Sequence, residues 1–486
     1  MEERYIATVD LGTSKIALAV ARVSGDDAEI LYYKTTPSDG VRYGCIYNPT
    51  KASVPLKAAI REAEDELGIK ITQVVIGVPR FGVKQEISSA KIERSDAESC
   101  ITREEVDDIK NLALDSYPLD DADRQEIYGA SAQSFSTDDS LGCTEEDVIG
   151  MPSAMLEGNF KVFIGQKKAT HNIDIMLNKS DVALACKYFL PPLTADAVLG
   201  ADEKENGVAL VEIGAGVSSV TIYQGGILRY YYSIPFGGQS VTNDIKMECG
   251  FGATLAENIK LGFGSCMPDK LQTLSDKILQ IRDEENGTEQ QLPVKYLAEI
   301  ITARMKEIFD AILFKIQESG YADRLRAGVV LTGGGAELAG CAGLFKEMSG
   351  YNVRTGYPRT RKFSFGGCSE LGESDAAATI GMLLHAREDS HLNCLDAVTG
   401  AKTGTTALLR NSASTVLPGN VEEEPADVTD TVFDPEPEKP AEKKPKQKNT
   451  EKKQLRVYEW FKKNTQEVVR KGEDLVGTLF DQMEEN

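Results

Sequence analysis

The sequence predicts a mixed α/β protein built of two lobes, each with its own sheet. Residues 5–23 and 207–225 repeat one another: in both, an apolar strand leads to an acidic residue, a spacer, a glycine, a turn of small residues and a second apolar strand. A third buried strand, predicted at 328–331, also runs into a glycine-rich turn. The 486 residues exceed what one hydrophobic core usually supports, so two lobes or more are expected.

The first half of the chain divides at turn and cap residues. Gly68 is a typical helix end, and Pro79 ends a strand. Thr102 followed by Glu105 resembles a capping box, within a segment that is unusually acidic from about residue 82 to 163 and is interpreted as an inserted subdomain. The expected elements are, in order, a β-hairpin at 5–23, a helix at 55–67, a strand at 73–78, a helix at 102–114, a loop at 134–143, and a strand and a helix at 159–177.

The second half repeats the hairpin and then becomes mostly helical. The glycine pair at 225–226 predicts a tight turn into a third strand. The expected elements are a hairpin at 207–225, a strand at 227–234, helices over 241–318 interrupted by a polar loop at 283–293, a strand at 328–331, and a glycine turn at 332–336 that opens a helix.

Composition excludes several classes of function. With 76 acidic and 54 basic residues, the net charge of −22 argues against general nucleic-acid binding. The nine cysteines are scattered and never spaced as C-x-x-C, so neither zinc nor a disulfide framework is indicated and a reducing cytosol is expected. We expect no secretory signal at the N-terminus, and no window reaches the roughly 18 apolar residues of a membrane span. We expect a protein that meets a membrane, if at all, from the side.

The repeated hairpins predict a nucleotide site. Gly12 and Gly214 let backbone N–H groups approach an anion, and the carboxylates of Asp10 and Glu212 at the strand ends can hold a hydrated divalent cation. Two such hairpins that face each other would grip the phosphates of a metal-bound nucleotide from both sides. The third glycine turn would present free N–H groups to the base, ribose and α-phosphate.

A helical segment supplies a further candidate pair. Glu257 and Lys260 lie three apart on one helical face, where they could touch a ribose and base. The alternative for this pair alone is a solvated ion pair.

The order of these motifs resembles that of the actin and DnaK-type ATPase superfamily, and within it the FtsA family of bacterial cell-division proteins. The resemblance covers residues 5 to about 386. It is carried by the insertion after the first strands and by the runs GILRYYYSIPFGGQSVTNDI (226–245), AENIKLGFGSC (256–266) and AGVVLTGGGAELAG (327–340). It implies an actin-like two-lobed ATPase fold of duplicated RNase H-like lobes, with an FtsA-type inserted subdomain, a disordered linker and a C-terminal amphipathic helix.

The resemblance also implies domain boundaries. These are a first lobe (1A) at 1–82 and 164–205, an inserted subdomain (1C) at 83–163, a second lobe (2A) at 206–238 and 321–388, its smaller subdomain (2B) at 239–320, a flexible linker at 389–453 and a membrane-targeting segment at 454–486.

The family's nucleotide contacts can be carried over position by position, and they imply ATP and Mg²⁺ as cofactors. Asp10 would be oriented toward the magnesium, through water, and Glu212 would position metal or water. Phosphate contacts are implied at Gly12, Thr13, Ser14, Lys15, Gly214, Ala215 and Gly216, and ribose and adenine contacts at Glu257, Lys260, Gly333, Gly334 and Gly335.

One departure from the family pattern bears on hydrolysis. Where the family usually has Asp-x-Gly-x-Gly-Thr, this chain has Glu212 and ends the motif with Val217, so the carboxylate is one methylene longer and the hydroxyl is missing. Misplacing a catalytic group by about 1 Å can cost on the order of a hundredfold in rate. We expect a slow or absent ATPase, with ATP acting as a conformational and assembly ligand.

The tail predicts a tethered membrane anchor. Residues 418–448 are rich in Pro, Glu, Asp and Lys, a composition too poor in apolar residues to fold. Residues 452–471 carry seven basic and two acidic side chains, a local balance of +5, around an apolar stripe that suits anionic lipid. The alternatives are that this helix docks on protein, or that the acidic half after Gly472 inserts. The residues expected at the membrane are Val457, Trp460, Phe461, Lys462, Lys463, Val468, Val469, Arg470 and Lys471.

The resemblance implies a protein that self-associates on the cytoplasmic side of the inner membrane, at the division septum. It would tether the tubulin-like protein FtsZ, whose tail would meet the 2B subdomain, where Arg304 is a candidate to pair with a tail carboxylate. Later division proteins of the membrane are implied as further partners.

Other classes of the same superfamily remain as alternatives. These are a sugar- or acetate-type kinase, which would need a catalytic Asp in the interlobe cleft, a DnaK-type chaperone, and assembly proteins of pili or plasmid segregation.

Overall fold

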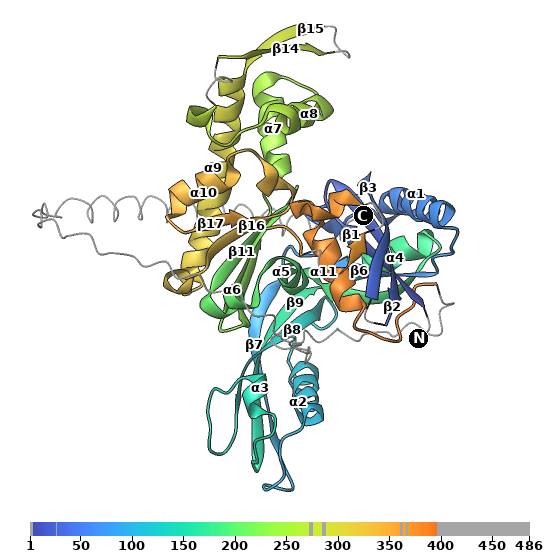
Figure 1. The fold of residues 1–486 in the computed structure, drawn as a ribbon, viewed down its shortest axis with the longest axis vertical. Coiled ribbons are helices and arrows are strands. Elements are labelled where there is room, and N and C mark those ends of the chain that lie inside the picture. Colours follow the sequence, from blue (N-terminus) through green and yellow to red (C-terminus); the bar gives the residue numbers. More distant parts are fainter. Residues whose placement is uncertain are drawn as a thin grey trace, which may run out of the picture.

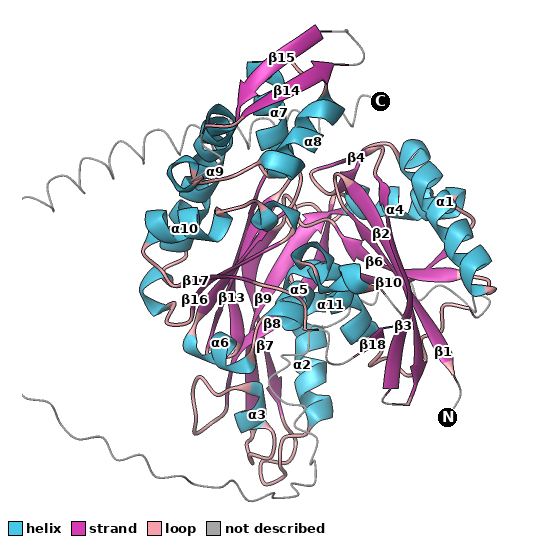
Figure 2. Ribbon diagram, turned by 45° about the horizontal axis from the view of Figure 1, so that its top comes forward, coloured by secondary structure: helices cyan, strands magenta, loops and turns pink. Residues whose placement is uncertain are grey.

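The computed structural model describes residues 3–25, 27–271, 276–283, 288–359, 363–365 and 368–395. Two large sheets stand side by side with helices around and between them (Figures 1 and 2). The first sheet has the strand order β10-β6-β1-β2-β3-β18 and the second the order β13-β12-β11-β16-β17. The predicted two-lobed α/β architecture is confirmed.

The two sheets share a common five-stranded arrangement, and this explains the repeat in the sequence. In each, three strands joined by hairpins run antiparallel and two further strands add in parallel beside the first of them. The first sheet has a sixth strand, β18, which pairs in parallel with β3 at the other edge. The strands of the first sheet are β1 (Arg4–Leu11), β2 (Lys15–Ser24), β3 (Asp27–Pro37), β6 (Gln73–Val78), β10 (Ala183–Phe189) and β18 (Ser364–Phe365). Those of the second are β11 (Val208–Ile213), β12 (Ser218–Gln224), β13 (Ile227–Ile234), β16 (Gly328–Thr332) and β17 (Val353–Thr355).

The second sheet is buried on both faces, as the continuous apolar run of β11 predicts. Because side chains alternate along a strand, Val208 and Leu210 join the hydrophobic cluster of the first lobe, whereas Ala209 and Val211 join that of the second. One sheet therefore contributes to two cores and fixes the lobes against each other.

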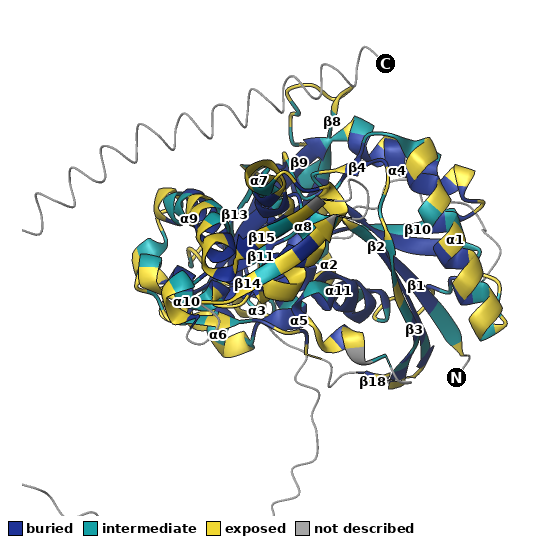
Figure 3. Ribbon diagram, turned by 90° about the horizontal axis from the view of Figure 1, so that it is seen from above, coloured by how far each residue is buried: buried dark blue, intermediate teal, exposed yellow. Residues whose placement is uncertain are grey.

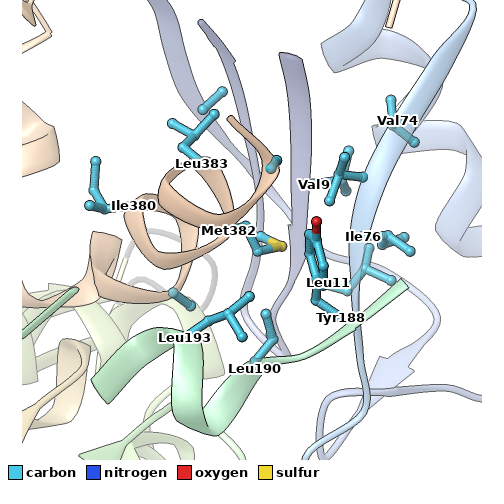
Figure 4. Packing of buried hydrophobic residues seen from close by; sticks show 14 of the residues in the cluster. Val9, Leu11, Val74, Ile76, Tyr188, Leu190, Leu193, Ile380, Met382 and Leu383 are labelled. Carbon is cyan, nitrogen blue, oxygen red and sulfur yellow. The ribbon is translucent and has the colours of Figure 1, made fainter. Parts of the chain in front are cut away.

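Two helices fill the space between the sheets: α5 (Leu190–Val198) and α11 (Ala377–Ala386). Figure 4 shows Leu193 of α5 and Met382 of α11 packed toward Val9 of β1 and Ile76 of β6. The backbones approach closely, since a Cβ added at Gly381 would lie 2.4 Å from the carbonyl oxygen of Leu193.

The position of α11 corrects two predicted boundaries. We assigned residues up to 388 to the second lobe and a linker from 389. Instead β18 pairs with β3, and α11 packs into the core of the first lobe because its apolar residues cover α5 and β1. The chain then runs on along the first sheet, where Cys394 N donates to Tyr5 O at 2.7 Å.

The outer face of the first sheet is covered by α1 (Pro49–Leu67) and α4 (Lys167–Lys179). In Figure 3 these helices are exposed outward, above buried strands. The predicted start of α1 at residue 55 is wrong, because Asn48 accepts a hydrogen bond from Lys51 N at 3.0 Å and Pro49 occupies the first helical position. Pro55 therefore lies inside the helix. The short strands β4 (Val41–Arg42) and β5 (Cys45–Ile46) precede it.

The inserted segment forms a separate small sheet at one end of the molecule (Figure 1), in the order β7-β9-β8. Its strands are β7 (Lys84–Glu93), β8 (Gln125–Ser136) and β9 (Met155–Gln166), and its helices are α2 (Arg103–Asp115) and α3 (Glu145–Val148). The capping box of Thr102 and Glu105 is present. The loop predicted from 134 begins later, because β8 continues against β9 to Ser136.

The opposite end of the molecule carries the helices of the second lobe (Figure 1). These are α7 (Gly238–Cys249), α8 (Ala253–Phe263) and α9 (Val294–Glu318); α6 (Ala201–Asn206) and α10 (Cys341–Ser349) lie nearer its sheet. The loop predicted at 283–293 is wrong: β14 (Ile278–Asp283) and β15 (Thr288–Pro293) form a hairpin, whose polar side chains hid the strand pattern. Short 3-10 turns are η1 (Pro268–Lys270), η3 (Ala322–Arg324), η4 (Gly334–Glu337), η6 (Ser369–Gly372) and η7 (Ser374–Ala376).

No helix among the described residues is long and apolar enough to cross a bilayer. The predicted membrane residues from Val457 to Lys471, and most of the predicted linker, lie outside the described residues.

A buried ion network joins the lobes beside α5. Asp196 of α5 pairs with Lys204 of α6, and its Oδ2 lies 2.7 Å from Nε2 of His385 on α11. The ammonium of Lys204 also lies 4.9 Å from the ring centroid of Tyr223 on β12. Burial by itself would raise the pKa of Asp196, but the charge of Lys204 and the contact with His385 lower it to about 2.

We predict that Asp196→Asn destabilises the fold by about 3–5 kcal/mol in urea unfolding near pH 7, because Lys204 is left buried without its carboxylate. The pKa of Asp196 is lower in the folded chain than its usual 3.8, so its contribution is complete above about pH 4. The difference between the two chains should therefore shrink as the pH falls toward 2.

The control is Asp181→Asn, which removes an ion pair whose carboxylate is 75% exposed and should change stability little. A loss below about 1 kcal/mol for Asp196→Asn would contradict the structural role of this network.

Candidate functional site

The two hairpin turns have the same local geometry. Gly12 N donates to Lys15 O at 2.9 Å in the first turn, and Gly214 N donates to Val217 O at 2.8 Å in the second. Asp10 and Glu212 also occupy equivalent positions, each one residue pair before the last pair of its hairpin. The repeat seen in the sequence is therefore a repeat of carboxylate and turn in space.

The turns face each other between the lobes. A Cβ added at Gly216 of the second turn would lie 2.7 Å from Oγ1 and 3.0 Å from Cγ2 of Thr13 in the first turn. Thr13 is held in place, since its Oγ1 accepts a hydrogen bond from Gly44 N at 2.9 Å. Only a residue without a side chain fits at position 216 at this approach.

Each turn is anchored by backbone hydrogen bonds to its own lobe. Ser14 O accepts from Ser38 N at 3.0 Å in the first lobe. In the second lobe, Gly214 O accepts from Gly238 N at 2.9 Å and Ala215 O accepts from Gln239 N at 2.8 Å, which ties this turn to the start of α7. The separation of the turns therefore follows the separation of the lobes.

Lys15, predicted to contact phosphate, has a carboxylate partner in this structure. Its ammonium pairs with Asp375 of η7, and both side chains are about three-tenths exposed. Asp375 belongs to the segment that returns to the first lobe, so a phosphate would compete with it for Lys15.

Sequence reasoning missed Arg80, which joins the two acidic residues. Its guanidinium pairs with Glu212 of the second lobe, and Nη2 lies 3.1 Å from Oδ1 of Asp10 in the first. The strand pairing could have predicted this position. Because β6 runs parallel to β1, with Val9 opposite Ile76, the residues that follow β6 lie at the same edge of the sheet as Asp10.

The third glycine turn lies at the same edge of the second sheet. Thr332 at the end of β16 is paired with Glu212 of β11. Gly333 adopts a left-handed backbone with φ +86°, and a Cβ added at Gly335 would lie 2.4 Å from Cγ2 of Ile213. The helix expected to start here is instead the 3-10 turn η4, which includes Gly334, because the tight packing against Ile213 bends the chain before α10 begins.

Glu257 and Lys260 form the predicted pair on one face of α8, but their surroundings differ. Lys260 is buried, and its Nζ donates to Glu257 Oε2 at 2.8 Å, Thr242 Oγ1 at 3.0 Å and Gly238 O at 3.1 Å. The side chain of Glu257 is 41% exposed. Lys260 thus fastens α8 to the start of α7, and Glu257 is the member of the pair that a ligand can reach.

Carboxylates predominate around the turns. Besides Asp10, Glu212 and Asp375, Glu337 accepts a hydrogen bond from Ser374 Oγ at 2.9 Å, and its pKa is raised by burial. Within the described ranges, no three His, Cys, Asp or Glu side chains converge as a metal cage. An anion would need accompanying positive charge to enter here, and a divalent cation would find few protein ligands and complete its shell with water or phosphate oxygens.

Arg304, the predicted partner contact, lies on α9, away from these turns. Its guanidinium holds Asp244 of α7 through two contacts of 2.5 and 2.9 Å and Glu307 through one of 2.6 Å. The hydrogen bond to Asp244 raises the pKa of Arg304 further. Its donors are thus already engaged within the chain.

Comparison with known proteins gives consistent results. A family model described as "Cell division protein FtsA" matches residues 209–380. The protein of that name from Neisseria meningitidis serogroup B is 30% identical over 390 residues, which are 79% of this chain and 90% of the relative. Those from Pseudomonas aeruginosa and Borreliella burgdorferi are each 28% identical, over 79% and 82% of this chain and 89% and 94% of the relatives.

Among solved structures, a chain of the PilM-PilN type IV pilus biogenesis complex aligns over 78% of this chain and 98% of its own, with a TM-score of 0.52 and 15% identity. At that identity, the likeness shows the fold alone.

We predict that Gly216→Ala costs about 1–3 kcal/mol of folding stability, because its methyl group meets Thr13 across the lobe gap. Combining it with Thr13→Ala should cost less than the sum of the two single changes, since the colliding atoms are gone. Urea unfolding of the four chains measures this coupling. Gly262→Ala, which has open space around its Cβ, is the control; equal costs for Gly216→Ala with and without Thr13→Ala would show that the turns do not meet.

Proposed function

The chain belongs to the FtsA family of cell-division proteins, and from this premise we propose that it is an ATP-binding, actin-like protein that self-associates on the cytoplasmic face of the cell membrane at the division septum. There it tethers the tubulin-like protein FtsZ and recruits later division proteins of the membrane. The proposal that the chain binds ATP rests on one observation: two equivalent hairpin turns, each with a carboxylate and a glycine, meet between the lobes.

The geometry supports a nucleotide that bridges the lobes. Gly12, Thr13, Ser14 and Lys15 would hold the phosphates from one side and the turn at 214–216 from the other. Glu257 would accept hydrogen bonds from the ribose, and the backbone at 333–335 would contact the base and α-phosphate. These elements belong to both lobes, so a bound nucleotide would set the angle between them.

The donor set fits a nucleotide that brings a divalent cation. Asp10 and Glu212 are both largely buried and face the same guanidinium, so an approaching polyphosphate meets an excess of negative charge. Mg²⁺ would neutralise phosphate charge and be held by Asp10, through water, with Glu212 beside it.

Efficient hydrolysis is not part of the proposal. Glu212 replaces the aspartate usual in the family and Val217 replaces the threonine, so the groups that would orient metal and water are displaced or absent. ATP would act through assembly, by stabilising one arrangement of the lobes.

The FtsZ tail is proposed to dock on the smaller subdomain of the second lobe. Arg304 there is bound to Asp244, so a tail carboxylate would have to replace Asp244. Apolar side chains are exposed on the same helices, with Met247 79% exposed and Leu261 70% exposed. Because Met247 is three residues from Asp244, both lie on one face of α7, next to which an amphipathic tail peptide can bind.

We predict that Glu257→Gln weakens binding of a fluorescent ATP analogue at least about tenfold, because a hydrogen bond to a charged acceptor contributes about 1.5–3 kcal/mol. Titration by fluorescence measures the affinity. The matched control is Glu347→Gln, which lies in an exposed ion pair with Lys270. Equal affinity of the Glu257→Gln and wild-type chains would remove Glu257 from the site.

We predict that the full chain co-sediments with anionic vesicles, whereas a chain stopped after Lys453 does not. FtsZ should pellet only with the full chain. The reason is the basic amphipathic stripe at 454–471, in which each basic residue near an anionic surface contributes about 1 kcal/mol. Reversing Lys462 and Lys463 to Glu should reduce the bound fraction at least about tenfold.

Neutral vesicles serve as the control surface, and ATP-analogue binding by the shortened chain shows that it is folded. If both chains stay in solution and FtsZ is ignored, the segment docks on protein and the tether proposal fails. If the shortened chain also pellets, the membrane contact lies elsewhere in the molecule.

A further inference from the structure

Arg80 connects the lobes through its side chain and its backbone. Its guanidinium pairs with Glu212 and lies 3.1 Å from Asp10, with the three side chains 19%, 13% and 14% exposed. Its carbonyl oxygen accepts a hydrogen bond of 2.5 Å from the hydroxyl of Tyr231 on β13, a residue that is 1% exposed. The backbone of Arg80 is thus fixed on the second lobe independently of its charge.

The charges explain why a cation must be here. Two largely buried carboxylates that face each other repel one another unless a positive group stands between them. Arg80 supplies one positive charge, and neither carboxylate has a second cationic partner among the described ion pairs. A divalent cation entering the same place would meet the carboxylates favourably and the guanidinium unfavourably.

We propose that Arg80 is a built-in counter-ion to Asp10 and Glu212 that competes with a divalent cation for these two carboxylates. It ties the two turns together and disfavours binding of a metal ion alone. The triphosphate attracts the guanidinium away from the carboxylates, and the metal ion then enters with the nucleotide. This last step rests on the proposed function, whereas the competition between Arg80 and a metal ion does not.

The decisive test measures binding of Mn²⁺ alone, without nucleotide, by the electron paramagnetic resonance signal of the free ion. Arg80→Gln should bind Mn²⁺ at least about tenfold more tightly than the wild type, because the competing charge is gone. Arg80→Lys, which keeps the charge, should stay within about threefold of the wild type. Adding Asp10→Asn to Arg80→Gln should remove the gain.

The matched control is Arg354→Gln, which removes a guanidinium from an ion pair with Glu203 on the second lobe and should leave Mn²⁺ affinity unchanged. Unchanged Mn²⁺ affinity in Arg80→Gln, or an equal gain in Arg354→Gln, overturns the proposal. If Arg80→Gln unfolds in chelator but folds with Mn²⁺, the metal ion replaces the guanidinium as proposed. If it unfolds in both, the arginine has another structural role and the proposal is wrong.

Titration of the wild type with the fluorescent ATP analogue separates the two hypotheses. A wild type that fails to bind it refutes the proposed function, while the Mn²⁺ comparison still decides the role of Arg80.

Discussion

The candidate site depends on one close approach, between the backbone of Gly216 in the second lobe and the side chain of Thr13 in the first. Both residues belong to hairpin turns whose strands are fixed in two sheets that share a five-stranded arrangement, so the turns can meet only if the sheets are held at one separation. That separation is set by α5 and α11, which lie between the sheets (Figure 2), and by the face of β11 that belongs to the first core. A ligand bound between the turns would therefore be sensitive to the separation of the lobes, and its binding would in turn favour one packing of the helices between them.

Charge imposes the second constraint. The turns bring Asp10 and Glu212 to equivalent positions, and the fold tolerates this because Arg80 lies between them. Beside α5, the buried carboxylate of Asp196 is likewise paired, with Lys204 and His385. At both places a buried charge, which would destabilise the fold if it were unpaired, forms an ion pair that joins the lobes. If the chain binds ATP as proposed, occupancy of the cleft would change how firmly the lobes are joined.

The sequence sufficed for features that depend on local pattern. The hairpin repeat, the glycine turns and the capping box at Thr102 each follow from residue type and spacing, and the topology of both sheets is consistent with them. Features that depend on distant partners were missed. The strand at 364–365 pairs with β3, about 340 residues earlier, and α11 packs on α5, about 190 residues earlier. Neither segment has a sequence pattern that identifies its partner. Arg80 belongs to no recognisable motif. The parallel pairing of β6 with β1 would nevertheless have predicted that it lies near Asp10. The β14–β15 hairpin was not predicted because β15 is mostly polar, and the burial of Ile281 and Leu292 in the second core depends on residues distant in the sequence.

The most direct test of the central claim is hydrogen–deuterium exchange of the wild-type chain with and without ATP and Mg²⁺. If the nucleotide lies between the lobes, peptides covering residues 12–15 and 214–216 should become protected together, along with those at 333–335. Protection confined to one turn, or to neither, would contradict a site formed by both lobes.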